Sequence, residues 1–153
     1  MTEVPHRRDA DNSFDPSNWM SKMPASFFTK KINQVILPGS WQAGAYDFSS
    51  NTLGQSKLSL LVWQFPSLMP WIKRHYRHHS KTILQQLKSG ARYFDLRIGY
   101  YNANDDDLLF STSGYYLTAG VNCVPLNDVL NQISTFCHTN PSEIILTKSR
   151  NLV

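Results

Sequence analysis

The chain has few cysteines and no long apolar run. Its two cysteines, Cys123 and Cys137, do not have the spacing of metal ligands, and nothing about them demands an oxidising compartment. No stretch reaches the ~18 consecutive apolar residues that a membrane-spanning helix needs. The polar N-terminus lacks the apolar segment of a secretory signal. We therefore expect a cytoplasmic protein without a transmembrane segment, at most peripheral to membranes.

Charge of either sign is also modest. Only 17% of the 153 residues are charged, and the net charge is +4, with the positive charge in short clusters such as residues 73–77. This balance favours a domain with a mildly basic face, and we expect no nucleic-acid partner. A hydrophobic content of 41% is enough for one core. The expected organisation is a flexible polar tail over residues 1–17 and one domain over residues 18–153.

The most informative stretch predicts a helix that leads directly into a strand. Ser80 is the expected N-cap, and Gly90 stands where a left-handed residue ends a helix; the apolar face between them holds Ile83, Leu84 and Leu87. From residue 91 to 98 the apolar residues alternate, as in a strand. Asp95 and Arg97 then share the other face. They either line a partly enclosed site or form a surface ion pair.

The remaining elements follow the same α/β order. We expect a buried strand at 32–37 that ends in a small-residue turn, Pro38 to Tyr46. A strand at 108–112 should end in a turn at 113–116. An amphipathic helix at 125–137 would place Cys137 in the core, and a last strand is expected at 142–148. Catalytic groups of α/β barrels lie at the C-terminal ends of strands, so the turns are the places to search for a site.

Three segments are open to two interpretations. Residues 58–72 could dip into lipid or cover the core, and we favour the cover. His75 and His79 have the spacing of a metal pair on a helix, but a solvated helix start is favoured because no third ligand is evident. The acidic residues 102–107 suggest a calcium loop, but they lack the spacing of its ligands, so a solvated connection is favoured.

The order of these segments resembles the X domain of phosphatidylinositol-specific phospholipase C, and in particular the small X-domain-containing proteins. The resemblance rests on the sequences LPGS, QQLxxGxRYFDLRI and NPSEIIL, and its matching segments are residues 18–20, 36–46, 83–98, 110–116 and 126–151. It implies a β/α barrel of the TIM type. Because such a barrel needs at least ~200 residues, we expect only its first half, with about four parallel strands. The chain would then be a partial X domain, from a truncated or spliced product, a fragment, or a half-barrel that needs a partner.

The resemblance also implies a chemistry. The family are phosphoric diester hydrolases of lipid metabolism and signalling, which cleave phosphatidylinositol between inositol phosphate and diacylglycerol. One histidine of the family acts as base and another as acid, while an arginine offsets the charge on the phosphate. By position, Arg97 and Asp95 are retained, and Arg150 lies near a substrate-binding lysine of bacterial members. An arginine at position 97, rather than an acidic residue, resembles the metal-free type, so we expect no metal and no cofactor.

Both catalytic histidines are replaced at the matching positions. Trp41 and Gln42 stand where the family has a His-Asp pair, and Ser113, or Thr112 if the register shifts by one, stands at the second histidine. Neither Trp nor Ser is an acid or base near pH 7, and we expect no histidine of this chain at a strand-end turn. Trp41 should fill part of the inositol pocket, close to Arg97 and Ser113. The chain is thus expected to be catalytically inactive; the alternatives are a module that binds inositol phosphate or anionic lipid, and a non-functional fragment.

Overall fold

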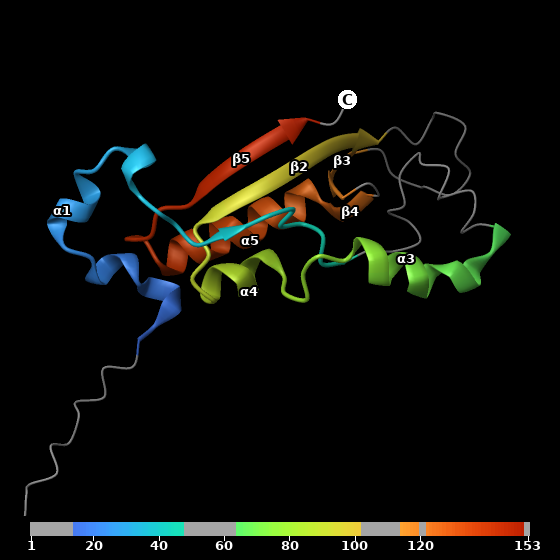
Figure 1. Cartoon of the computed structure of the whole chain (residues 1–153), viewed down its shortest axis with the longest axis horizontal. Helices are drawn as coiled ribbons and strands as arrows, with labels where there is room; N and C mark the ends of the chain where they lie inside the picture. Colours follow the sequence, from blue (N-terminus) through green and yellow to red (C-terminus); the bar gives the residue numbers. More distant parts are fainter. Residues whose placement is uncertain (1–13, 48–63, 102–113, 120–121, 152–153) are drawn as a thin grey trace, which may run out of the picture.

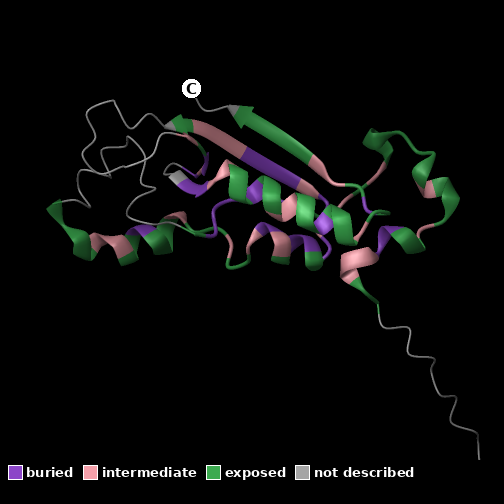
Figure 2. Cartoon of the chain, turned by 180° about the vertical axis from the view of Figure 1, so that it is seen from behind, coloured by how far each residue is buried: buried purple, intermediate pink, exposed green. Residues whose placement is uncertain are grey.

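The computed structural model describes residues 14–47, 64–101, 114–119 and 122–151. Their strands form one sheet, with helix α5 (Leu126–Thr139) along one face and helix α4 (Ile83–Lys88) beside α5 (Figures 1 and 2). The strands are β1 (Gly39–Ser40), β2 (Tyr93–Tyr101), β3 (Gly114–Thr118), β4 (Asn122–Pro125) and β5 (Leu146–Asn151). Short helices precede β1, namely η1 (Pro16–Asn18), η2 (Met20–Lys22), α1 (Ala25–Phe28) and η3 (Ile32–Gln34). Between β1 and α4 lie η5 (Pro66–Leu68) and α3 (Met69–Tyr76).

The sheet is mixed, so the prediction of four parallel strands is wrong. Strand β2 is parallel to β1 and to β5, but β3 is antiparallel to β2 and β4 is antiparallel to β3. The connection between β3 and β4 explains why these two strands are antiparallel. It spans only residues 119–121, and a parallel pair needs a crossover of a dozen or more residues. The turn predicted at 113–116 was misplaced, because residues 114–118 form β3; the strand predicted at 108–112 lies outside the described residues.

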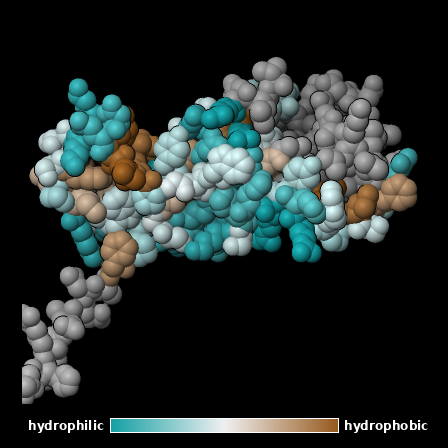
Figure 3. Space-filling model, in the orientation of Figure 1, coloured by the Kyte–Doolittle hydropathy of each residue, from teal (hydrophilic) through white to brown (hydrophobic). Residues whose placement is uncertain are grey.

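The buried strand predicted at 32–37 is absent as well. Residues 32–34 form η3, and Ile36 is 96% exposed. Pairing with β2 begins only at Gly39, opposite Tyr93, so the preceding residues have no strand beside them. Hydrophobic side chains gather instead on the surface beside α1, where Ile32 and Ile36 are exposed (Figure 3).

The two predicted core helices are present, with small corrections. Thr82 rather than Ser80 caps α4, because its side chain accepts a hydrogen bond from the Gln85 N–H and the Gln85 side chain accepts one from the Thr82 N–H. Gly90 has a φ of 101°, as predicted. Helix α5 points Val129 and Phe136 into the core, but Cys137 is exposed. One residue further is a rotation of about 100° round a helix, which turns Cys137 away from the sheet.

A buried ion pair joins the beginning of β2 to the segment before β5. The side chains of Arg92 and Glu143 are fully buried, and Nη2 lies 2.6 Å from Oε2. Glu143 Oε1 accepts hydrogen bonds from the backbone N–H groups of Met20 and Ser21, and Arg92 donates to the Ser17 carbonyl. The last residues of the predicted tail are thus held against the sheet, while residues 1–13 lie outside the described part.

Candidate functional site

The candidate site begins on β2 with a buried carboxylate between two arginines. The Asp95 side chain is 8% exposed, and its Oδ2 lies 3.4 Å from Arg97 Nε. Its Oδ1 lies 3.8 Å from Nε of Arg150, which the parallel register of β2 and β5 places beside Arg97. Arg97 is 24% exposed and Arg150 is 56% exposed, so the group runs from the interior to the surface. The sheet therefore brings together the three charged residues that the resemblance pointed to, in a partly enclosed place.

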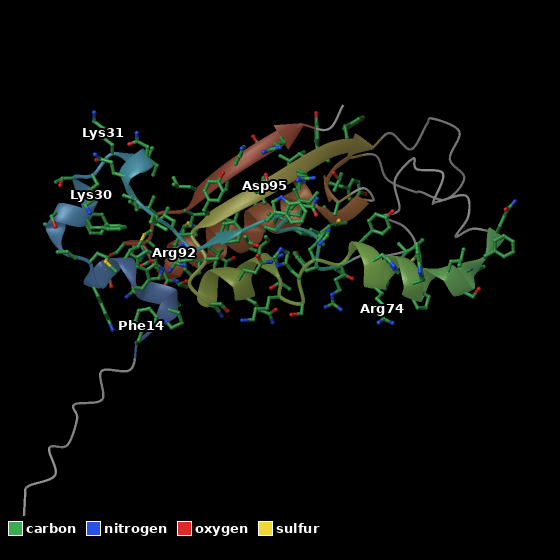
Figure 4. The ribbon with its side chains drawn as sticks, viewed as in Figure 1. Phe14, Lys30, Lys31, Arg74, Arg92 and Asp95 are labelled. Atoms are coloured by element: carbon green, nitrogen blue, oxygen red, sulfur yellow. The ribbon has the colours of Figure 1, made fainter. Side chains whose placement is uncertain are left out.

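One carboxylate oxygen of Asp95 is buried without a hydrogen-bond donor from the described residues. Its Oδ1 is buried and makes no hydrogen bond with the described residues, since the distance to Arg150 is too long for one. A buried acceptor without a donor is unfavourable by about 1–3 kcal/mol. A hydroxyl group of a bound molecule would satisfy it. Figure 4 shows Asp95 well along β2, away from the structural pair at Arg92.

The turn after β1 lies beside Asp95 and has a strained backbone. Gln42 has a φ of 48°, in the left-handed region that non-glycine residues rarely adopt. Its side chain is buried, and within the described residues Oε1 has no hydrogen-bond partner. The next residue, Ala43, donates its N–H to the carbonyl of Asp95 at 3.1 Å. This hydrogen bond joins the turn to β2. Backbone strain of the kind seen at Gln42 is concentrated at functional sites.

Trp41 projects from this turn over Arg97. The guanidinium carbon lies 5.0 Å from the centre of the indole, which is a cation–π contact. The predicted closeness of Trp41 to Arg97 is therefore confirmed, while Ser113 lies outside the described residues. The Trp41 side chain stays 57% exposed, so it forms a rim of the site rather than a buried plug.

Two histidines lie against the same turn, which corrects the prediction that none does. The imidazole of His78 is 5.2 Å from the indole of Trp41, centre to centre. His79 Nε2 lies 2.6 Å from the Trp41 carbonyl oxygen and 3.3 Å from Ser40 Oγ. The backbone N–H groups of both histidines donate to the Ala45 carbonyl, at 2.9 and 3.1 Å. Residues 77–80 are therefore a link that folds back over the turn, not a solvated helix start.

The surroundings of His78 disfavour its charged form. Although His78 is exposed, partial desolvation lowers its pKa below the usual 6.5, and the nearby His79 and Arg97 lower it further. The ring is therefore largely neutral at pH 7. A neutral imidazole can accept one hydrogen bond and donate another. Local periodicity gave no signal of this placement. Only the tertiary fold brings residue 78 to residue 41.

The structure also tests the metal pair of His75 and His79 that their spacing suggested. His75 Nδ1 lies 2.9 Å from the Trp71 carbonyl oxygen, and its ring lies against the indole of Trp71 rather than beside His79. Among the described residues, no three His, Cys, Asp or Glu side chains lie close enough together to hold a metal ion. The expected absence of a metal stays a prediction.

The chain is similar to known proteins in both sequence and structure. No family model matches the chain. A PI-PLC X domain-containing protein of Dictyostelium discoideum is 30% identical over 122 residues, which cover 78% of this chain and 19% of that protein. PI-PLC X domain-containing protein 1 of Homo sapiens is 24% identical over 139 residues, which cover 88% of this chain and 42% of that protein. The chain thus spans well under half the length of these curated relatives.

The fold comparison agrees. A phosphatidylinositol-specific phospholipase C of Staphylococcus aureus, solved in work on its membrane binding, superposes with a TM-score of 0.57 and 20% identity. The match covers 90% of this chain and 36% of that one. The resemblance found in the sequence is therefore confirmed, and the mixed sheet fits part of a phospholipase C-like barrel. Across the described residues, no helix is both long and apolar enough to cross a membrane.

Proposed function

We propose that this relative of phosphatidylinositol-specific phospholipase C X domains binds a phosphodiester head group of the inositol lipid type and does not cleave it. The observation that carries the proposal is Asp95 beside two arginines, with an Oδ1 that makes no hydrogen bond to the described residues. A guanidinium offers several N–H donors in a fork that matches a phosphate, and the Nε–H of Arg97 is the one near Asp95. A phosphate at Arg97 with a cyclitol hydroxyl on Asp95 would use both groups. Arg150 is the more exposed second cation.

We propose that the chain is inactive because of the residues that occupy the turn after β1. Cleavage requires a base within about 2.6–3.2 Å of the attacking hydroxyl. At the position of the family's base, Trp41 has one N–H donor and no acceptor lone pair, and the amide of Gln42 does not titrate. The imidazole of His78 reaches Trp41 from another segment, and we propose that it binds the anion instead of acting as that base. General acid–base groups contribute about 10²–10⁴-fold each. With Ser113 at the second family position, we expect turnover beneath detection.

We further propose that the segment η5–α3 contacts the lipid surface. Phe65 is 54% exposed and Trp71 is 51% exposed, and Lys73 and Arg74 follow Trp71 on the same helix. Aromatic rings beside basic residues suit the interface between head groups and acyl chains. Contact there would bring lipid toward the link at residues 77–80. The cytoplasmic location stays a prediction.

The test compares binding and turnover on the same sample. Vesicles of phosphatidylinositol in phosphatidylcholine should bind the chain, and release of inositol phosphate should stay at the background rate. Arg97→Gln should weaken binding by about tenfold or more, since hydrogen bonds to charged groups contribute about 1.5–3 kcal/mol. Lys30→Gln removes one positive charge from an exposed position between α1 and η3, at the opposite end of the molecule from α3 (Figure 4), and should have a smaller effect.

Each alternative has its own outcome. Equal losses in the two variants would show that only a basic surface is involved. Cleavage by the unaltered chain would overturn the proposed inactivity. The absence of both binding and turnover in a folded sample would favour the non-functional alternative.

A further inference from the structure

The link at residues 77–80 suggests how the ligand is held, which the family comparison does not show. It places an imidazole beside the arginine of the candidate site, although the turn has no histidine of its own. Arg97 and His78 both contact the indole of Trp41, with distances of 5.0 Å from the guanidinium carbon and 5.2 Å from the imidazole centre to the indole centre. Two groups that can bind an anion thus contact the same exposed aromatic ring.

The position of this imidazole is fixed by the backbone. The N–H of His78 donates to the Ala45 carbonyl at 2.9 Å, and the following N–H of His79 shares the same acceptor. The side chain of His79 is occupied in holding the turn, because the Trp41 carbonyl oxygen needs a donor and Nε2–H supplies it at 2.6 Å. Arg77 Nε donates to the His79 carbonyl at 3.0 Å and holds the link from outside. His79 is therefore structural, and the His78 ring is the one presented to the site.

We propose that His78 is a second ligand of the anion bound at Arg97, and that it takes up a proton when a phosphodiester head group binds. This inference rests on the proposed function. The anion would lie at the rim formed by Trp41, with the guanidinium on one side and the imidazole within reach. Among the described residues, the charged or ionisable groups that act on His78 are both basic, namely His79 on its own link and Arg97 on β2. A bound anion reverses that balance and favours the imidazolium.

The consequence is an affinity that rises as the solution becomes acidic. Above the pKa of His78 in the complex, binding depends on Arg97 and the neutral imidazole. Between that pKa and the lower pKa of the empty site, each bound ligand also binds a proton, so affinity increases as pH falls. Below both pKa values the affinity is constant again. The size of the increase is the ratio of the two acid dissociation constants of His78, without and with the bound anion.

The experiment measures binding of glycerophosphoinositol by calorimetry at about pH 7.5 and at about pH 5, on either side of an ordinary histidine pKa. This probe is a phosphodiester, so its own charge does not change over that range. The unaltered chain should bind about tenfold more tightly at the lower pH. His78→Gln should lose most of this increase. His75→Gln is the matched control, because it removes an imidazole that lies against Trp71 on α3, and it should keep the increase.

The outcomes separate this inference from the proposed function. Binding at both pH values with the full increase retained in His78→Gln would overturn the role of His78 and leave the Arg97 site intact. Loss of the increase in His75→Gln as well would also overturn it, since the effect would then come from the overall charge. Failure of the unaltered chain to bind at either pH would overturn the proposed function, and this inference with it.

Discussion

Removal of the buried carboxylate of Glu143 should be the most damaging single change in the described part of the chain. Both side chains of the Arg92–Glu143 pair are completely buried. In Glu143→Ala, the guanidinium would stay buried without its counter-charge, and the N–H groups of Met20 and Ser21 would lose their acceptor. Breaking a buried pair from one side costs about 3–5 kcal/mol.

That loss is large relative to the stability of an ordinary domain, which is about 5–15 kcal/mol. For a chain of this size, one kcal/mol corresponds to roughly 2–4 °C in Tm, so we expect a decrease of about 6–20 °C. Urea unfolding followed by tryptophan fluorescence would measure the change, because Trp19 lies against Arg92. Asp128→Ala is the control. It removes an exposed carboxylate from the first turn of α5 and should cost at most about 1 kcal/mol.

A second variant tests the reason for the loss. Arg92→Met combined with Glu143→Leu removes both charges together and should be less destabilising than the two single changes added. The Arg92 guanidinium also donates to the carbonyls of Leu87 and Ala91, so the double variant should not recover full stability. A free energy of unfolding for Glu143→Ala within about 1 kcal/mol of the Asp128→Ala value would refute the reasoning.

Two further predictions concern packing and thiol chemistry. Gly44→Ala should destabilise the fold by about 1–3 kcal/mol, because its Cβ would lie 2.5 Å from the Leu117 Cβ; Gly114→Ala, where the nearest atom is 3.7 Å away, should cost less in the same urea titration. Ellman's reagent should modify one thiol of the native protein quickly, because Cys137 is exposed while burial raises the pKa of Cys123 to about 12. Rapid modification of a second thiol in the folded protein would contradict this.

The local patterns predicted the helix-to-strand unit well and the sheet less well. The alternation from residue 91 to 98 correctly separated Phe94 and Leu96 from Asp95 and Arg97, because a strand with one packed face has a strict period of two. The run at 32–37 looks like a strand in isolation, but a strand also needs a neighbour. That neighbour, β2, begins opposite Gly39.

The orientation of β3 was missed for a related reason. Gly114 was assigned to a turn because glycine often marks one, yet it is the first residue of the strand. The β-forming residues Tyr115, Tyr116 and Thr118 follow it and favour a strand there. The short connection to β4 then forces antiparallel pairing. The length of this connection, compared with the crossover that a parallel pair needs, therefore predicts an antiparallel pair.

The candidate site shows the same division between local and tertiary information. The pattern on β2 identified Asp95 and Arg97, and the resemblance added Arg150, which the β2–β5 register places beside Arg97. Position-by-position matching also showed that the turn holds Trp41 instead of a histidine. Such matching reports what one position has lost, but not which other segment lies there in the folded chain.

The histidines of the link make that difference concrete. Residues 78 and 79 reach the turn because two successive backbone N–H groups bind one carbonyl, that of Ala45, and no side-chain pattern in the sequence encodes this contact. Whether an imidazole lies at the site therefore depends on which side chains are close to Trp41 in the folded chain, and not on which residue aligns with the family's histidine. An indole with a guanidinium at 5.0 Å and an imidazole at 5.2 Å is suited to holding an anion, even where the base that the family uses for cleavage is absent. Binding and cleavage thus depend on different residues here, and each can be tested without the other.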